Sequence, residues 1–235
     1  MFEHCKPQTH KSTEEVLQKL GKFEFGLGPG EIRNDLDFCR KEYKKSHAIY
    51  EGQMIKRSNI REGRGYYELP KGGYFEGWFK GDKYHGQGRQ VTSDGEVYHG
   101  EWIEGQRHGY GQQYYNSGAC YKGNWKQNVK HGQGVMIYPY GDVYNGWFEE
   151  GKRQGFGGFT TKDGATYVGN WSNDKKHGHG TQKWPNGREY KGEFLQGRFD
   201  GVGVMNYPEG KQRRGVFDKN RFVRELVQES SDMRM

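Results

Sequence analysis

A glycine that closely follows an aromatic residue returns at a fixed interval through most of the chain, and this repeat restricts the fold more than any other feature. Such glycines are spaced 23 residues apart from Gly77 onward, and Gly52 lies 25 residues before Gly77. A regular period of this length is typical of proteins built from stacked repeats, in which each unit packs only against its neighbours. The regularly spaced glycines are Gly77, Gly100, Gly123, Gly146, Gly169, Gly192 and Gly215.

Within one repeat the residues alternate as they do in a β-hairpin. Tyr98, Gly100 and Trp102 share one face of an extended strand, and Gly109 and Gly111 lie on the returning strand. A glycine inside a strand is usually found where another group approaches the backbone closely, and here the neighbouring ring is the candidate. We therefore predict a core of rings seated on glycines. Its rings are Tyr98, Trp102, Tyr121, Trp125, Tyr144, Phe148, Tyr167, Trp171, Tyr190 and Phe194.

Dipeptides that favour turns separate the repeats. Asp94-Gly95, Asp163-Gly164 and Asn186-Gly187 accept positive φ angles, so we expect them to form tight two-residue hairpin loops. The predicted fold class is therefore all-β. It is an elongated, single-layer antiparallel meander of stacked β-hairpins, with short helical extensions at both ends of the chain.

The run Tyr-x-Gly-x-Trp, then Gly-x-Gly, then Asp-Gly at this spacing resembles the MORN (membrane occupation and recognition nexus) repeat family. The resemblance covers about residues 50–217, although Phe148 and Phe194 stand where the family has tryptophan. Arg213 stands where a tyrosine begins a repeat, which indicates a partial last unit. The resemblance implies a repeat domain at 49–217, with seven repeats and a partial eighth.

The remaining residues are predicted to form an N-terminal extension (1–48) and a C-terminal extension (218–235). Ser12 and Glu15 have the spacing of a helix-capping box, and a short apolar stripe follows them. Apolar residues recur at helical spacing over 31–45 and again after residue 217, which predicts a second and a third short helix. These helices would either cover an exposed edge of the sheet or dock on a partner, and the sequence leaves both open.

Composition limits the class of protein. Only 31% of the residues are hydrophobic but 15% are aromatic, so rings must supply a core that aliphatic residues usually provide. Cys5, Cys39 and Cys120 lack the spacing of a disulfide framework or a zinc site, which favours a reducing compartment. No apolar run is long enough to span a membrane, and we expect no secretory signal in residues 1–11.

The sequence predicts no catalytic residue, no metal site and no cofactor. His85, His108, His131 and His177 recur at equivalent positions, but equivalent residues of stacked hairpins lie about 10 Å apart, too far to bind one zinc ion. None of the common motifs for a nucleophilic serine, a zinc protease or a phosphate-binding loop is present. We therefore expect that the chain is not an enzyme.

Two sets of residues are candidates for binding a partner. Rings that the sheet leaves half open would form an aromatic groove for an extended peptide or a helix. These rings are Tyr115, Tyr138, Trp184 and Tyr207. The net charge of +7 includes a basic surface that favours acidic partners. This surface consists of Lys152, Arg153, Lys175 and Lys176.

The resemblance to MORN repeats implies a non-catalytic scaffold or adaptor that bridges protein partners in a multi-subunit assembly. Relatives of this kind act at the cytoskeleton, including the radial spokes of the ciliary axoneme, so the expected location is cytoplasmic and cytoskeleton-associated. The alternative is a peripheral module that binds anionic phospholipid through basic loops. A regulatory subunit of an enzyme and a homodimer also remain open. Nucleic acid is not favoured, because the rings recur where the core needs them.

Overall fold

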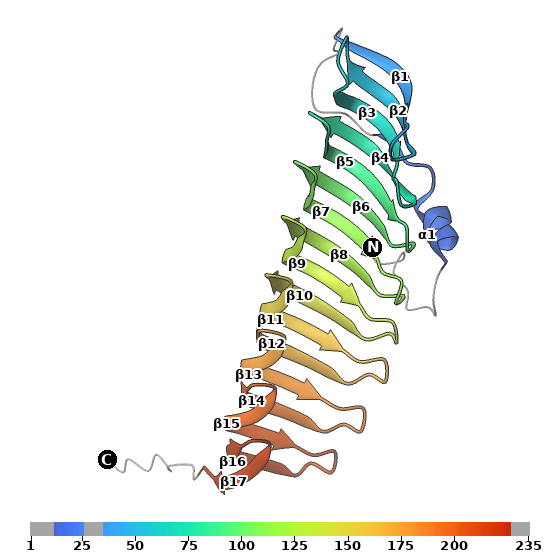
Figure 1. Ribbon diagram of the computed structural model, residues 1–235. Coiled ribbons are helices and arrows are strands. Elements are labelled where there is room, and N and C mark those ends of the chain that lie inside the picture. Colours follow the sequence, from blue (N-terminus) through green and yellow to red (C-terminus); the bar gives the residue numbers. More distant parts are fainter. Residues whose placement is uncertain (1–11, 26–34, 227–235) are drawn as a thin grey trace. The chain divides into compact units, whose positions relative to one another are not determined.

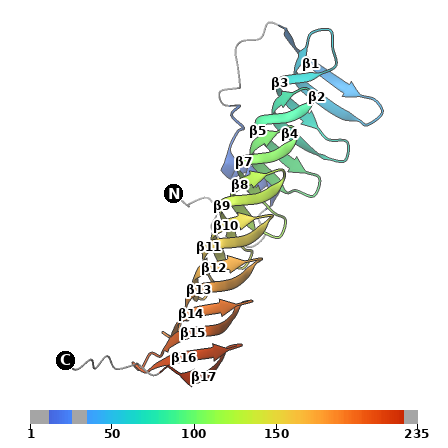
Figure 2. The same cartoon turned by 90° about the vertical axis from the view of Figure 1, so that its left-hand side faces the viewer.

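The computed structural model describes residues 12–25 and 35–226 (Figures 1 and 2). The chain divides into two compact units, Met1–Asp142 and Val143–Met235. The described part of the chain contains one α-helix and seventeen β-strands. Each unit is an antiparallel meander, because every strand in it pairs with the next strand along the sequence.

The first unit holds the helix and nine of the strands. They are α1 (Thr13–Leu20), β1 (Leu36–Tyr43), β2 (Ala48–Ile55), β3 (Arg61–Glu68), β4 (Gly73–Lys80), β5 (Lys83–Thr92), β6 (Val97–Ile103), β7 (Gln106–Tyr114), β8 (Cys120–Lys126) and β9 (Val129–Ile137). The second unit holds the other eight. They are β10 (Val143–Glu149), β11 (Lys152–Thr160), β12 (Thr166–Ser172), β13 (Lys175–Lys183), β14 (Glu189–Leu195), β15 (Arg198–Asn206), β16 (Gln212–Asp218) and β17 (Arg221–Glu225).

A row of glycines crosses the strands of each unit. Gly100 of β6 pairs with Gly111 of β7, which in turn pairs with Gly123 of β8. In the second unit Gly157 of β11 pairs with Gly146 on one side and with Gly169 on the other. The 23-residue period therefore sets the register, because it brings the glycines of successive strands side by side.

The tyrosine rings lie on this glycine row. A Cβ atom added to Gly134 would lie only 2.5 Å from Oη of Tyr121. The same hydroxyl donates a hydrogen bond to the carbonyl of Asn124 at 2.9 Å, and the Tyr121 ring packs edge to face on Trp125 with 5.1 Å between centroids. All ten rings named above as the repeat core are buried. The predicted all-β meander of stacked hairpins is confirmed. Below, the face that carries these rings is called the ring face, and the other is called the opposite face.

The loops differ from the prediction. Gly95 donates to the carbonyl of Thr92 at 3.0 Å and Thr92 donates to that of Glu96 at 2.9 Å, so Asp94-Gly95 belongs to a longer loop in which the glycine has a positive φ of 89°. The two-residue loops lie at the other end of the strands, for example at Glu104-Gly105, with φ of 52° and 82°. Both residues of a two-residue loop need a positive φ angle. The longer loop at Asp94-Gly95 needs a positive φ angle only at its glycine.

Two of the predicted helices are wrong over the residues that the structure describes. The pattern at 31–45 forms strand β1, which pairs with β2 along its whole length, and the pattern after residue 217 forms β17, paired with β16. Pairing satisfies the backbone donors of an edge strand, and this outweighs a weak helical pattern. Residues 31–34 and 227–235 of these predictions lie outside the described residues.

The first predicted helix is confirmed as α1, and it covers the sheet rather than its edge. Ser12 caps the helix by accepting a hydrogen bond from the backbone N–H of Glu15 at 3.3 Å. The helix lies beside the strands of the first unit (Figure 1). The buried side chain of Val16 packs against Val91 and Val97 on the opposite face of this unit. The N-terminal segment therefore supplies the apolar cover that this face of the first unit lacks in its own strands.

Candidate functional site

A column of cations lies over the rings on the ring face. Its members occur at equivalent positions of the repeat, four of them just after a two-residue loop, and we call it the cation column. The guanidinium of Arg107 lies 4.5 Å from the centre of the Trp125 ring, and that of Arg153 lies 4.3 Å from Trp171. Stacking of this kind is favourable because the face of an aromatic ring is electronegative. The column consists of Arg61, Arg107, Lys130, Arg153 and Lys176.

The loop of the following repeat holds each arginine of the column. Arg153 donates from Nε to Oδ1 of Asp174 at 3.1 Å and from Nη2 to the carbonyl of Asp174 at 2.7 Å. Arg61 makes the same pair of bonds with Asp82, both at 3.0 Å. Asp174 and Asp82 occupy the second position of a two-residue loop, with φ of 67° in both cases. Asp and Asn tolerate this backbone conformation and provide an acceptor, so one residue makes the turn and fixes the cation.

A hollow lies on the ring face of each unit, beside a member of the cation column. The hollow of the first unit has a volume of about 300 Å³ and is lined by Tyr84, Trp102, Arg107 and Gln113 among others. Arg107 donates a hydrogen bond to Oε1 of Gln113 at 2.9 Å across this hollow. Rings form part of its walls, and Arg107, Glu96 and several amide side chains supply its polar groups.

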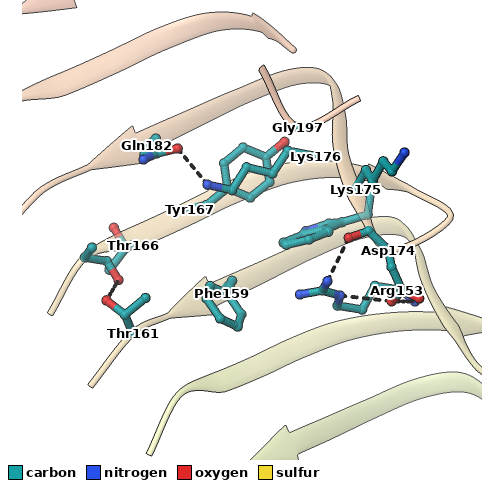
Figure 3. A pocket seen from close by; sticks show the side chains of 12 residues that line it. Arg153, Phe159, Thr161, Thr166, Tyr167, Asp174, Lys175, Lys176, Gln182 and Gly197 are labelled. Carbon is teal, nitrogen blue, oxygen red and sulfur yellow. Dashed lines mark hydrogen bonds and ion pairs between the residues drawn. The ribbon is translucent and has the colours of Figure 1, made fainter. Parts of the chain in front are cut away.

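The hollow of the second unit is built in the same way and also measures about 300 Å³. Figure 3 shows Lys176 lying over Tyr167 and reaching Gln182, with Phe159 and Arg153 beside them. Nζ of Lys176 lies 4.9 Å from the centre of the Tyr167 ring and donates to Oε1 of Gln182 at 2.7 Å. A partner that enters this hollow would meet aromatic rings and the basic side chains of Arg153 and Lys176, and Lys175 and Asp174 also line it.

Burial perturbs ionisable groups in and beside both hollows. Burial lowers the pKa of Lys176 to about 8, and the nearby charge of Arg153 lowers it further in the same direction. Burial also lowers the pKa of Arg107 and raises the pKa of Tyr115 to about 12. The hydroxyl groups therefore stay neutral at physiological pH, whereas Lys176 is close to titration.

Replacing Lys176 by methionine is expected to raise the free energy of unfolding at pH 7 by about 1 kcal/mol, a value reduced for screening of this partly exposed side chain. The lowered pKa means that the folded chain binds fewer protons than the unfolded chain between about pH 8 and the ordinary value of 10.5. The free energy of unfolding of the wild type therefore rises with pH across that window, as Lys176 loses its proton. Below the window the full cost of burying the charged side chain remains.

Urea unfolding from pH 7 to 10.5 measures this effect. The difference between the wild type and Lys176→Met should shrink as the pH rises. Lys175→Met is the control, because the neighbouring Lys175 is exposed and should change neither the stability nor its slope with pH. Equal slopes for all three chains would contradict the assignment.

The four rings predicted as a groove are all half-buried, and each follows the end of a strand. In the second unit Trp184 and Tyr207 are brought together by Arg188, whose guanidinium lies 5.3 Å from one ring and 5.4 Å from the other. In the first unit Tyr115 lies in the field of Arg107, and Tyr138 closes its loop by accepting from Gly141 at 3.0 Å. Each unit therefore contains two of these rings, and a cation lies near Tyr115, Trp184 and Tyr207.

The four residues predicted as a basic surface separate into two kinds. Lys152 and Lys175 are exposed, and each bonds to a loop residue of the next repeat, Asn173 at 3.4 Å and Gln196 at 2.7 Å. Arg153 and Lys176 belong to the cation column described above. Neighbouring residues of a strand point to opposite faces, so a basic pair in the sequence does not form one basic patch in the structure.

The cation column is a feature that the sequence analysis missed. A signal for it was present, because a basic residue stands at the same place of the repeat four times in succession. Those residues are Arg107, Lys130, Arg153 and Lys176. Within residues 12–25 and 35–226, the structure brings together no group of His, Cys, Asp and Glu side chains that could hold a metal ion. The same residues include no helix with the length and apolar character needed to cross a membrane.

The sequence profile described as the MORN repeat matches seven successive segments of the chain. They are residues 50–74, 75–97, 98–120, 121–143, 144–166, 167–187 and 190–212. The chain belongs to the MORN-repeat family. Six of these MORN repeats begin at a tyrosine that lies on the glycine row, namely Tyr50, Tyr98, Tyr121, Tyr144, Tyr167 and Tyr190. Membership of the family indicates a module for protein interaction or membrane binding.

Among solved structures, the MORN-repeat chain is similar to the TCP domain of SAS-4 from Drosophila melanogaster, which was solved in complex with a proline-rich motif of Ana2. The identity is 12% and the TM-score is 0.41, over 66% of this chain and 85% of that chain. It is also similar to the TCP10 domain of CPAP from Danio rerio, with 10% identity and a TM-score of 0.32 over 81% and 98% of the two chains. No match was found among curated protein sequences.

Proposed function

We propose that this chain is a non-catalytic scaffold or adaptor whose ring face binds segments of partner proteins in a larger cytoskeletal assembly. The observation that carries the proposal is the hollow on the ring face of each unit, which is lined by aromatic rings together with charged and amide side chains. Shallow sites of this composition suit peptide segments, because the rings contribute apolar contact and the polar groups fix the backbone of the peptide.

The chemistry of the hollow also indicates which peptide it would bind. Lys176 is partly desolvated and its pKa is lowered, so an acidic side chain placed beside it would restore its charge and gain a charge-assisted hydrogen bond. The half-open rings of Trp184 and Tyr207 would contact an apolar side chain of the same segment. We therefore propose a partner segment that combines an acidic residue with an aromatic or aliphatic one.

Membership of the MORN-repeat family supports the scaffold role, and it is our reason to propose assemblies of the cilium and axoneme, including radial spokes. Binding to anionic lipid is the competing function. It is less favoured by the geometry, because Arg153 and Lys176 are engaged over rings and leave Lys152 and Lys175 as the exposed members of the predicted basic surface.

Proximity labelling followed by mass spectrometry tests the scaffold role. The variant carries Trp184→Ser and Tyr207→Ser, and the control carries Tyr140→Ser, because Tyr140 is 84% exposed in a loop and is not one of the four rings of the predicted groove. We expect a set of labelled proteins that the double variant loses and the control keeps. Thermal melting of both chains establishes that they fold.

Flotation with vesicles that contain or lack anionic phospholipid separates the two functions. A scaffold should not float with either vesicle at low salt. Flotation that requires anionic lipid and disappears at high salt, together with equal labelling by the double variant and the control, would refute the scaffold role and favour the lipid-binding one.

A further inference from the structure

An exposed apolar patch lies on the opposite face of the second unit, and we call it the Trp147 patch. It consists of Trp147 of β10, Phe156 and Gly158 of β11 and Val168 of β12. The exposed fractions of Trp147, Phe156 and Val168 are 43%, 64% and 47%. Gly158 pairs with Val168 in the sheet, and Phe156 is the next residue on the same face of β11. Apolar side chains gathered in this way on a surface often mark a binding site.

The centre of the patch is a depression at Gly158. A Cβ atom added there would find nothing nearer than a methyl group of Val168 at 3.8 Å, so the site would accept a side chain without any movement. Other repeats carry Arg89, Val135 or Val204 at the equivalent position. The glycine is therefore not required by the packing of the sheet, unlike its neighbour Gly157, which lies under the ring of Tyr144.

The first unit shows how the same surface is covered when a segment lies on it. Trp78 is three periods before Trp147, and the two side chains pack identically on Gly86 and Gly155, with closest distances of 3.5 and 3.6 Å to a Cβ placed there. The indole N–H of Trp78 donates to the carbonyl of Phe25 at 2.7 Å. That carbonyl belongs to residues 21–25, which cross the opposite face of the first unit.

Two further contacts hold residues 21–25 in place. Nη1 of Arg89 donates to the carbonyl of Gly21 at 2.9 Å, and the ring of Phe23 is 5% exposed with its centre 5.8 Å from that of His99. Gly158 and Val168 stand where Arg89 and His99 would be in the second unit. The second unit thus retains the tryptophan donor and replaces a basic and a titratable side chain by a glycine and a valine.

We propose that the Trp147 patch binds an extended segment of a partner protein that carries apolar side chains two residues apart, as Phe23 and Phe25 are. The indole N–H of Trp147 donates to a backbone carbonyl of the segment, and an apolar side chain fills the depression between Gly158 and Val168. In the described part of the chain no residue bonds to this indole or packs a ring on Phe156.

The neutral rim of the patch adds no charge that would select an acidic or a basic segment. Asn145 and Asn170 flank the patch on the same face, and both are exposed neutral amides. Since the patch has no counterpart of Arg89, a carbonyl there has one fixed donor, Trp147, and most of the affinity must come from apolar contact. Binding should therefore depend little on salt, in contrast to the acidic segment proposed for the ring face.

This inference does not depend on the ring face. The two surfaces lie on opposite faces of the same strands, so a segment in the hollow near Lys176 does not obstruct a segment on the Trp147 patch. A chain with both surfaces can hold two partner segments at once, which a bridging scaffold requires.

The probe is a synthetic peptide with the sequence of residues 17–25, blocked at both ends, added to the full chain labelled with ¹⁵N at its tryptophan indoles. We expect the indole signal of Trp147 to shift as the peptide is added, whereas those of Trp102, Trp125 and Trp171 stay, because these donate to carbonyls inside the sheet. A Trp147 signal that does not move, or movement of the Trp78 signal alone, would overturn the proposal.

Two variants and a truncation complete the test. Phe156→Ser should weaken peptide binding about tenfold or more by removing apolar contact, and a peptide with serine in place of Phe23 should weaken it similarly. Lys175→Met should leave it unchanged. If removal of residues 227–235 shifts the Trp147 signal without peptide, the chain's own tail occupies the patch and the proposal of a partner segment is wrong.

Discussion

Replacing Gly157 by alanine is expected to destabilise the second unit by about 3 kcal/mol. A Cβ atom at this position would lie 2.5 Å from Oη, 2.7 Å from Cζ and 2.8 Å from Cε2 of Tyr144. The tyrosine cannot move aside, because its ring is fully buried and its hydroxyl donates to the carbonyl of Trp147 at 3.0 Å. The added methyl group must therefore displace a ring or separate two paired strands, and urea unfolding monitored by circular dichroism measures the cost.

The adjacent residue provides the control for this prediction. Gly158 is in the same strand and has an ordinary backbone conformation. A side chain at this position would point to the opposite face, where a Cβ atom would have no contact closer than 3.8 Å. Gly158→Ala is expected to be neutral or to stabilise the unit by about 0.5–1 kcal/mol, because alanine loses less backbone entropy on folding. Similar losses for the two variants would mean that the ring does not lie on the glycine row.

The sequence predicts the ring core because one period fixes both the register and the face. Once Gly100, Gly111 and Gly123 are spaced to pair across strands, the rings that alternate with them can lie on one face only. The two incorrect helices have a common cause. Short segments such as Leu36–Tyr43 fit a helical and a strand pattern about equally well, and the free edge of the neighbouring hairpin decides between them.

The site is less predictable because it depends on partners distant in the sequence. The cation column requires knowledge that Arg153 turns toward the rings while Lys152 turns away, and that Asp174 reaches back to hold it. The cover over the first unit requires the contact between Trp78 and Phe25, which are 53 residues apart. Neither follows from a local pattern, although the period of the basic residues could have indicated the column.

Truncation of Trp171 to alanine should cost about 3–5 kcal/mol, as expected for a large buried aromatic side chain. The residue is 5% exposed, and its ring packs edge to face on Tyr144 and Tyr167 with 5.2 Å between centroids in both cases. Its indole N–H donates to the carbonyl of Gly157 at 3.1 Å, and Arg153 lies over its other surface. Removal of the ring leaves a cavity, takes the indole donor from the carbonyl of Gly157 and removes the ring nearest to Arg153.

Trp147→Ala removes the same side chain from the same unit and is expected to cost less than about 1 kcal/mol, because exposed side chains contribute little to the core. Trp147 lies on the opposite face, with its indole directed away from the rings. Both variants remove a tryptophan from the same chain. The difference between their melting temperatures therefore measures the effect of the face on which the tryptophan lies. If Trp147→Ala unfolds as easily as Trp171→Ala, then the opposite face of this unit is part of the core, and it could not serve as an open surface for a partner.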